Sequence, residues 1–70
     1  MWKRGTVVRV RDDKGFGFIR VADGGQDAFF HASSLEGIHF GPHLQEMRIE
    51  FIPEVDPSGR VRATRVRAAA

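Results

Sequence analysis

Short segments of alternating side chains, each ended by turn-forming residues, constrain this fold more than any other feature. Residues 6–11, 16–21, 27–31, 47–52 and 60–66 have this pattern, which is typical of half-buried strands. Asp and Gly residues at 12–15, 23–25 and 56–59 favour turns between them. The longer connection at 33–44 contains two glycines and a proline, and predicts at most a helical turn at 33–36. The sequence therefore predicts an all-β chain.

The chain has 70 residues and no cysteine, so disulfides and cysteine-ligated metals are excluded as supports for a small core. A closed sheet is an economical alternative, because closure removes exposed edges. Five short strands with one long third connection predict a five-stranded antiparallel Greek-key barrel of the OB type. We expect one domain over residues 1–70, with its core at about 5–66. Pro53 should lie near the end of its strand, because proline cannot donate to a central ladder.

Charge is nearly balanced overall but unevenly placed. Ten of the 11 Lys and Arg residues lie in the first third or the last eleven residues of the sequence, whereas many of the nine Asp and Glu residues lie between them. If the ends meet in space, one face is basic, although alternating arginines are also the ordinary solvated side of strands. No apolar run is long enough to span a bilayer, and the first residues lack the apolar stretch of a signal peptide. We expect a cytoplasmic monomer without membrane contact.

The segment Lys14–Ile19 carries the strongest functional signal. In a strand, Phe16 and Phe18 point to one face, and Gly17 and Ile19 point to the other. A mid-strand glycine marks close backbone approach or curvature.

Residues 27–31 repeat this arrangement, with Phe29 and His31 on one face and residues 28 and 30 on the other. If the two strands pair, Phe16, Phe18, Phe29 and His31 form one aromatic platform. Exposed rings beside basic residues suit unpaired bases, which stack with little dependence on sequence. The alternative is that these are ordinary core phenylalanines.

The chain resembles the bacterial cold-shock proteins and the related cold-shock domain. Lys14-Gly15-Phe16-Gly17-Phe18-Ile19 matches the first ribonucleoprotein-type motif of that family at every position, and residues 27–33 resemble its second motif. Residues 5–7 and 63–66 are similar to the family's opening and closing segments. The resemblance covers about residues 5–66. It implies an OB barrel that binds single-stranded RNA or DNA, often with a preference for pyrimidines, and that commonly acts as an RNA chaperone.

The sequence also departs from the family pattern. Arg9 stands where the family has a stacking tryptophan, Val10 replaces a phenylalanine, and Ala32 replaces the ring after the histidine. A guanidinium plane stacks on bases and pairs with phosphate, so Arg9 is expected to compensate in part. We expect weaker binding, a shorter site or a shifted base preference. Trp2 supplies another ring or covers the end of the barrel.

The residues expected to bind nucleic acid fall into two groups. The stacking residues are Phe16, Phe18, Phe29, His31 and Phe40, the last matching a family position usually held by an aromatic. Contacts to phosphates or bases are assigned to Lys14, Arg9, Arg11, Arg20, Asp27 and Arg60. The partner is single-stranded RNA or DNA. The alternative function is a protein-interaction module on the same fold, with incidental nucleic-acid binding.

Other chemistry finds little support. His39 and His43 have helical spacing, but Gly41 and Pro42 between them disfavour a helix, so we expect no metal site. Gly15 and Gly17 lack the context of a phosphate-binding loop. No nucleophile and base are patterned together, and we therefore expect neither a cofactor nor an enzyme activity.

Overall fold

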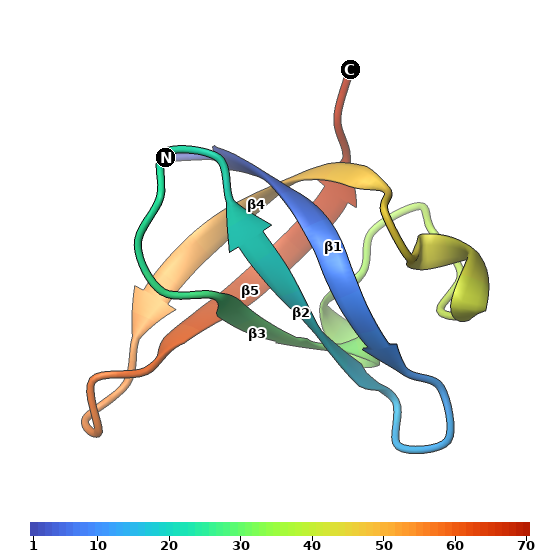
Figure 1. Cartoon of the computed structure of the whole chain (residues 1–70), viewed down its shortest axis with the longest axis horizontal. Helices are drawn as coiled ribbons and strands as arrows, with labels where there is room; N and C mark the ends of the chain where they lie inside the picture. The colour runs from blue at the N-terminus through green and yellow to red at the C-terminus, as the bar shows by residue number, and fades with distance from the viewer.

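Five strands form the framework in the computed structural model, which describes residues 1–70 (Figure 1). Their bounds are β1 Lys3–Arg11, β2 Phe16–Val21, β3 Ala28–His31, β4 Arg48–Val55 and β5 Val61–Ala68. Two short 3₁₀ turns, η1 at Ala32–Ser34 and η2 at Pro42–Leu44, lie in the long connection between β3 and β4. No helix in the structure is long and apolar enough to cross a membrane.

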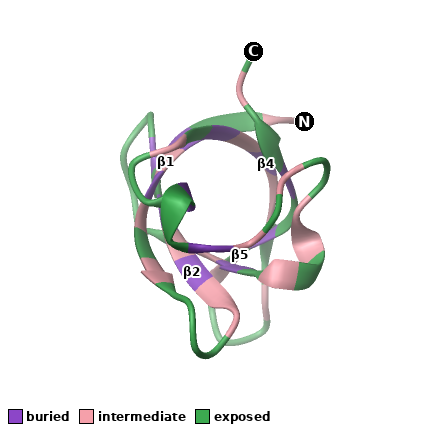
Figure 2. Cartoon of the chain, turned by 90° about the vertical axis from the view of Figure 1, so that its right-hand side faces the viewer, coloured by how far each residue is buried: buried purple, intermediate pink, exposed green.

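The strands close into a barrel in the order β1-β2-β3-β5-β4, and Figure 2 shows this ring end-on. Four of the neighbouring pairs are antiparallel, whereas β3 and β5 meet in parallel at Phe29 and Arg62. The predicted all-β, five-stranded OB-type barrel is confirmed.

The core lies inside this ring. Each strand contributes its inward residues, because side chains alternate between the two faces. Phe30, Phe51, Ile19 and Ile49 are fully buried, and Leu44 from η2 is fully buried with them. No polar or charged residue is buried. The apolar side chains that the alternation assigns to the inner face are therefore the ones that hold the barrel together.

Glycine allows β1 to pair with two neighbours as it curves. Its first half pairs with β4 while the strand also pairs with β2. A Cβ on Gly5 would lie 2.5 Å from Ile19 Cγ2 and 2.7 Å from the carbonyl oxygen of Arg20. The pairing with β2 shifts register between Val7 and Arg9, which is typical of a β-bulge and increases local twist.

Strand boundaries differ from the sequence predictions where pairing extends them. β1 begins at Lys3 and β5 ends at Ala68, because both ends pair with β4. Pro53 lies near the end of its strand, as predicted, although β4 continues beyond it to Val55. A register shift between Ile52 and Pro53 accommodates the proline, which bulges commonly do.

Candidate nucleic-acid interface

Three phenylalanine rings gather on the outer surface of β2 and β3. Phe18 lies opposite Phe29, and Phe16 lies opposite His31, in the antiparallel register of the two strands. The ring centroids are 5.9 Å apart for Phe16 and Phe18, 5.3 Å for Phe16 and Phe29, and 5.8 Å for Phe18 and Phe29. All three rings are half-buried. The structure therefore brings the rings of the expected aromatic platform together on one exposed face.

The inner side of the same strands explains why these rings point outward. Gly17, Ile19, Ala28 and Phe30 face the core and are buried. A Cβ on Gly17 would lie 2.5 Å from the carbonyl oxygen of Arg9 and 2.8 Å from the Phe30 ring. Only glycine fits between the neighbouring backbone and Phe30, so the mid-strand glycine marks the close approach that the sequence predicted.

A groove of about 1050 Å³ runs over this surface. Seven residues expected from the sequence line it, namely Phe16, Phe18, Phe29, Arg9, Arg20, Asp27 and Arg60. The remaining lining residues are Val8, Gln26, Asp56, Val61 and Arg62. We call the surface formed by these residues the groove face.

Three other expected contact residues lie beside the groove without lining it. His31 is exposed opposite Phe16, and its Nδ1 accepts a hydrogen bond from the backbone N–H of Ser33 at 3.2 Å. Arg11 also pairs with Phe16, from β1, and has Asp13 Oδ1 at 3.9 Å from its Nε. Lys14 is exposed in the turn between β1 and β2.

Phe40 lies in a different environment from Phe16, Phe18 and Phe29. Its ring packs against the core, with its centroid 6.3 Å from that of Phe30, and it does not line the groove. Phe30 points to the inside of the barrel. The half-buried ring of Phe40 packs beside Phe30 and makes no ring contact with Phe16, Phe18 or Phe29, so its role at the end of the aromatic platform stays a prediction.

Arg62 is the groove residue that sequence reasoning most clearly missed. Its Cα pairs with Phe29 across the parallel contact of β3 and β5, and its Cζ lies 6.0 Å from the Phe29 ring centroid. Alternation along the last strand places Arg62 on the same face as Arg60, which was expected to bind. That signal was present, but only the β3–β5 pairing brings this face beside the rings.

The arginines of the groove face have no ion-pair partners. The five ion pairs of the structure involve Lys3, Arg4, Arg11, Arg65 and Arg67, and none of these lines the groove. Arg9, Arg20, Arg60 and Arg62 therefore present guanidinium groups that make no ion pair, although the charge of Arg60 contributes to lowering the pKa of the nearby Asp56. Such a surface attracts polyanions.

The two carboxylates of the groove differ in their surroundings. Asp56 Oδ1 accepts hydrogen bonds from Ser58 Oγ at 2.6 Å and from the backbone N–H groups of Ser58 and Arg60 at 2.9 and 3.0 Å. These bonds, that from the Ser58 hydroxyl foremost, lower the pKa of Asp56 below its ordinary value. Asp56 thus fixes the predicted turn, whereas Asp27 is exposed and makes no hydrogen bond or ion pair through its side chain.

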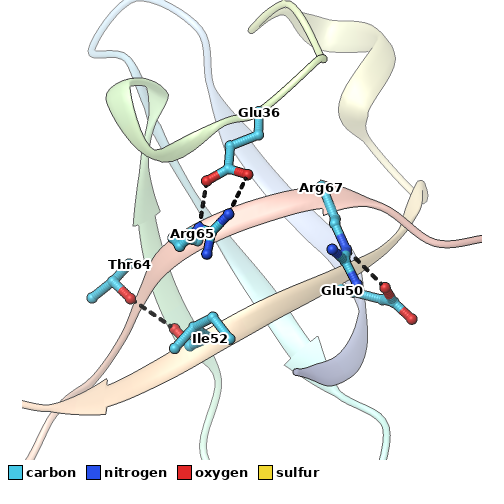
Figure 3. Close-up of polar contacts among 6 residues, drawn as sticks. All are labelled: Glu36, Glu50, Ile52, Thr64, Arg65 and Arg67. Carbon is cyan, nitrogen blue, oxygen red and sulfur yellow. Dashed lines mark hydrogen bonds and ion pairs between the residues drawn. The ribbon is translucent and has the colours of Figure 1, made fainter. Parts of the chain in front are cut away.

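A second group of charged residues covers the outer side of β4 and β5 (Figure 3). Arg65 binds both carboxylate oxygens of Glu36, at 2.6 and 3.0 Å, and Arg67 binds Glu50 at 3.0 Å. Both arginines lie over the ring of Trp2. The ring centroid is 3.6 Å from Arg67 Cζ and 5.0 Å from Arg65 Cζ. We call Trp2, Glu36, Glu50, Arg65 and Arg67 the ion-pair face.

The bidentate ion pair between Arg65 and Glu36 shifts the pKa of both residues. The hydrogen bond from Arg65 lowers the pKa of Glu36 below its ordinary value, and the same bond raises the pKa of Arg65. The ring of Trp2 contacts Arg65 and Arg67 of β5 and does not line the groove. It therefore covers the outside of β5.

No group of three or more His, Cys, Asp or Glu side chains is placed to hold a metal ion. The arginines, phenylalanines and two aspartates of the groove face suit hydrogen bonding, charge pairing and stacking.

Comparisons with known proteins agree with this geometry. The sequence model of the 'Cold-shock' DNA-binding domain matches residues 3–69. The chain is 45% identical over 64 residues to cold shock domain-containing protein 4 of Arabidopsis thaliana, covering 91% of this chain and 32% of that protein. It is 40% identical over 48 residues to the cold shock-like protein CspC of Escherichia coli, covering 69% of this chain and 70% of that one.

A solved structure shows the same fold. Drosophila Unr CSD456 superposes with a TM-score of 0.77 at 22% identity, covering 100% of this chain and 27% of that chain. The chain spans about a third of the length of the Arabidopsis relative and about a quarter of the Drosophila chain.

Proposed function

The chain belongs to the cold-shock domain family, a nucleic-acid-binding and non-enzymatic family, and from that premise we propose that it binds single-stranded RNA or DNA on the groove face. Bases stack on Phe16, Phe18 and Phe29, and guanidinium groups beside the rings neutralise phosphates. The observation that carries this proposal is the contiguity of three half-buried outer rings with arginines that make no ion pair.

Stacking supplies affinity without a strict sequence requirement. Each base stacked on an aromatic ring contributes about 1–3 kcal/mol as measured by alanine substitution. Three rings within 5.9 Å of one another provide a surface for neighbouring bases of one strand. A duplex keeps its bases stacked on each other, so the proposed surface discriminates against it. Such a protein opens weak RNA pairing by holding bases in the unpaired state, and we propose a role of this kind, as an RNA chaperone in the cytoplasm.

An arginine takes the place of one lost ring in this site. Arg9 stands where the family has a stacking tryptophan, and it lies opposite Phe18. Guanidinium groups bind phosphate through a planar fork of donors and also stack on bases. We propose that Arg20 and Arg60 hold phosphates and that Lys14, Arg11 and His31 extend the path of the strand beyond the groove.

Fluorescence anisotropy of labelled heptanucleotides tests the proposal. A labelled U7 or dT7 should bind at low salt, weaken as salt is added, and bind better than a duplex of the same length. Phe18→Ala should weaken binding roughly 5-fold or more. Trp2→Ala is the matched control, because it removes a ring from the ion-pair face. This variant should bind the heptanucleotides with the same affinity as the unaltered protein.

Failure has a clear form in this experiment. A folded protein that binds no heptanucleotide at low salt, or a Phe18→Ala variant that binds as tightly as the unaltered protein, contradicts the proposal. A search for a protein partner of the groove face would then follow.

A further inference from the structure

The groove face contains a row of four residues that crosses four neighbouring strands. Arg9 of β1 pairs with Phe18 of β2, Phe18 pairs with Phe29 of β3, and Phe29 pairs with Arg62 of β5. Strands lie about 4.7–4.9 Å apart, so residues in such a row are side-by-side neighbours. Two rings are therefore flanked, one on each side, by an arginine without an ion-pair partner.

This row determines which chemical groups a stacked base meets at its edges. Arg62 Cζ lies 6.0 Å from the Phe29 ring centroid, so a base stacked on Phe29 comes within reach of its guanidinium. Arginine offers donors in a planar fork and no acceptor. The base edge that complements a fork of donors has two adjacent acceptors.

Asp27 supplies the opposite chemistry in the same groove. Alternation puts it on the same side of the chain as Phe29, and its carboxylate makes no hydrogen bond or ion pair. The other groove carboxylate, Asp56, uses one oxygen to hold its turn. A free carboxylate repels phosphate, so its presence in the groove favours a partner with N–H donors, and base edges provide these.

Guanine is the base that satisfies both groups. Its N7 and O6 form an acceptor pair that arginine binds in a bidentate manner, and its N1–H and 2-amino group form a donor pair that suits a carboxylate. Adenine places a donor beside its N7, and uracil and thymine offer no edge with two adjacent donors. Cytosine has an acceptor pair but a single donor group. We propose that the groove face prefers single strands that contain guanine, with Arg62 and Arg9 as donors and Asp27 as acceptor.

This inference rests on the proposed function and departs from it in one respect. Stacking and phosphate contacts tolerate any base, and the family resemblance implies a preference for pyrimidines. Arg9 and Arg62 are the residues by which the row differs from an all-aromatic surface, and together with Asp27 they shift the preference toward a purine.

Heptanucleotides with one variable central base test the preference. The probes are U3-G-U3, U3-A-U3, U3-C-U3 and U7, and a single guanine in each strand avoids four-stranded assembly. We expect U3-G-U3 to bind about tenfold more tightly than U7. Replacing the guanine with 7-deazaguanine removes the N7 acceptor, and replacing it with inosine removes the 2-amino donor. Each change should abolish most of that advantage.

Protein variants identify the groups that act. Arg62→Gln and Arg9→Gln replace a donor fork with an amide, which matches adenine, so at least one of them should lower the ratio of guanine to adenine affinity severalfold. Asp27→Asn should remove the difference between guanine and inosine. Arg20→Gln is the matched control, because it should weaken all four strands equally and leave their ratios unchanged.

The outcomes separate this inference from its premise. Equal affinity for the four strands, with salt dependence and the Phe18→Ala effect retained, overturns the guanine preference and leaves the proposed function standing. Tighter binding of U7 than of U3-G-U3 also overturns it. Absence of binding to every strand overturns both.

Discussion

The groove face and the ion-pair face both combine aromatic rings with arginines, and they differ in what the arginines contact. On the ion-pair face, Arg65 and Arg67 bind the carboxylates of Glu36 and Glu50, and both lie over the ring of Trp2. On the groove face, four arginines lie beside three rings without any ion pair. Both faces have rings and arginines, so this content alone does not separate them; only the groove face has arginines free of ion pairs, and on that difference we base its assignment as the proposed binding surface.

Removal of two rings from the groove face should have the largest effect. A Phe18→Ala and Phe29→Ala double variant loses two stacking surfaces, which together contribute about 2–6 kcal/mol. We expect the dissociation constant for U7 to rise roughly 30-fold or more, as measured by anisotropy. Circular dichroism should show an intact barrel, because both rings lie outside the core. Unchanged affinity in a folded double variant would show that the rings do not bind bases.

The ring arrangement follows from local rules, and for that reason the sequence predicts it. Side chains alternate in strands, so Phe16 and Phe18 share a face once Gly17 and Ile19 are assigned to the core. The turn at 56–59 is similarly local, because Asp56 caps it through hydrogen bonds to residues two and four positions later.

Three features that the sequence does not predict depend on contacts between distant parts of the chain. Arg62 joins the groove only through the parallel contact with Phe29, and no local pattern specifies that pairing. Phe40 lies in an irregular connection, where the space beside Phe30 decides which way the ring points. Proline has no backbone N–H to donate to a neighbouring strand. The register shift between Ile52 and Pro53 accommodates this, so β4 continues to Val55.

Phosphate contacts should give the next largest effect. Arg20→Ala and Arg60→Ala should each reduce the steepness of log affinity against log salt concentration by about 0.7, the value for one phosphate on a single strand. Affinity should fall uniformly across base sequences.

Arg48→Ala serves as the control for these two variants, since Arg48 is exposed on β4 and lies outside the groove. Equal salt dependence for all three variants would mean that an arginine at any surface position contributes equally to phosphate binding. The groove face would then not be distinguished as the phosphate-binding surface.

The ion-pair face should contribute to stability instead. Trp2→Ala removes the ring that both arginines contact, and each cation–π contact at an exposed site contributes about 0.5–1 kcal/mol. We expect the free energy of unfolding in urea, followed by circular dichroism, to fall by about 1 kcal/mol. Weakened binding of U7 by this variant would contradict the assignment of Trp2 to the non-binding face.

The smallest effect concerns acid stability. Arg65 lowers the pKa of Glu36, so the pair stabilises the fold above the ordinary Glu pKa of about 4.3 and loses this contribution as pH falls through the lower pKa of the folded state. Glu36→Gln should therefore be less stable than the unaltered protein at pH 6, and the difference should shrink on acidification. Because the pair is exposed, added salt should also reduce the difference. A difference that grows on acidification would show that the pair does not act in this way.

A ¹⁵N–¹H correlation spectrum recorded during titration with unlabelled U7 tests the distinction between the faces most directly. We expect the backbone amides of residues 16–18, 28–30 and 62 to shift as U7 is added. The indole N–H of Trp2 and the amides of Arg65 and Arg67 should stay in place. Shifts concentrated at Trp2, Arg65 and Arg67, with residues 16–18 unmoved, would contradict the assignment of the groove face as the nucleic-acid interface.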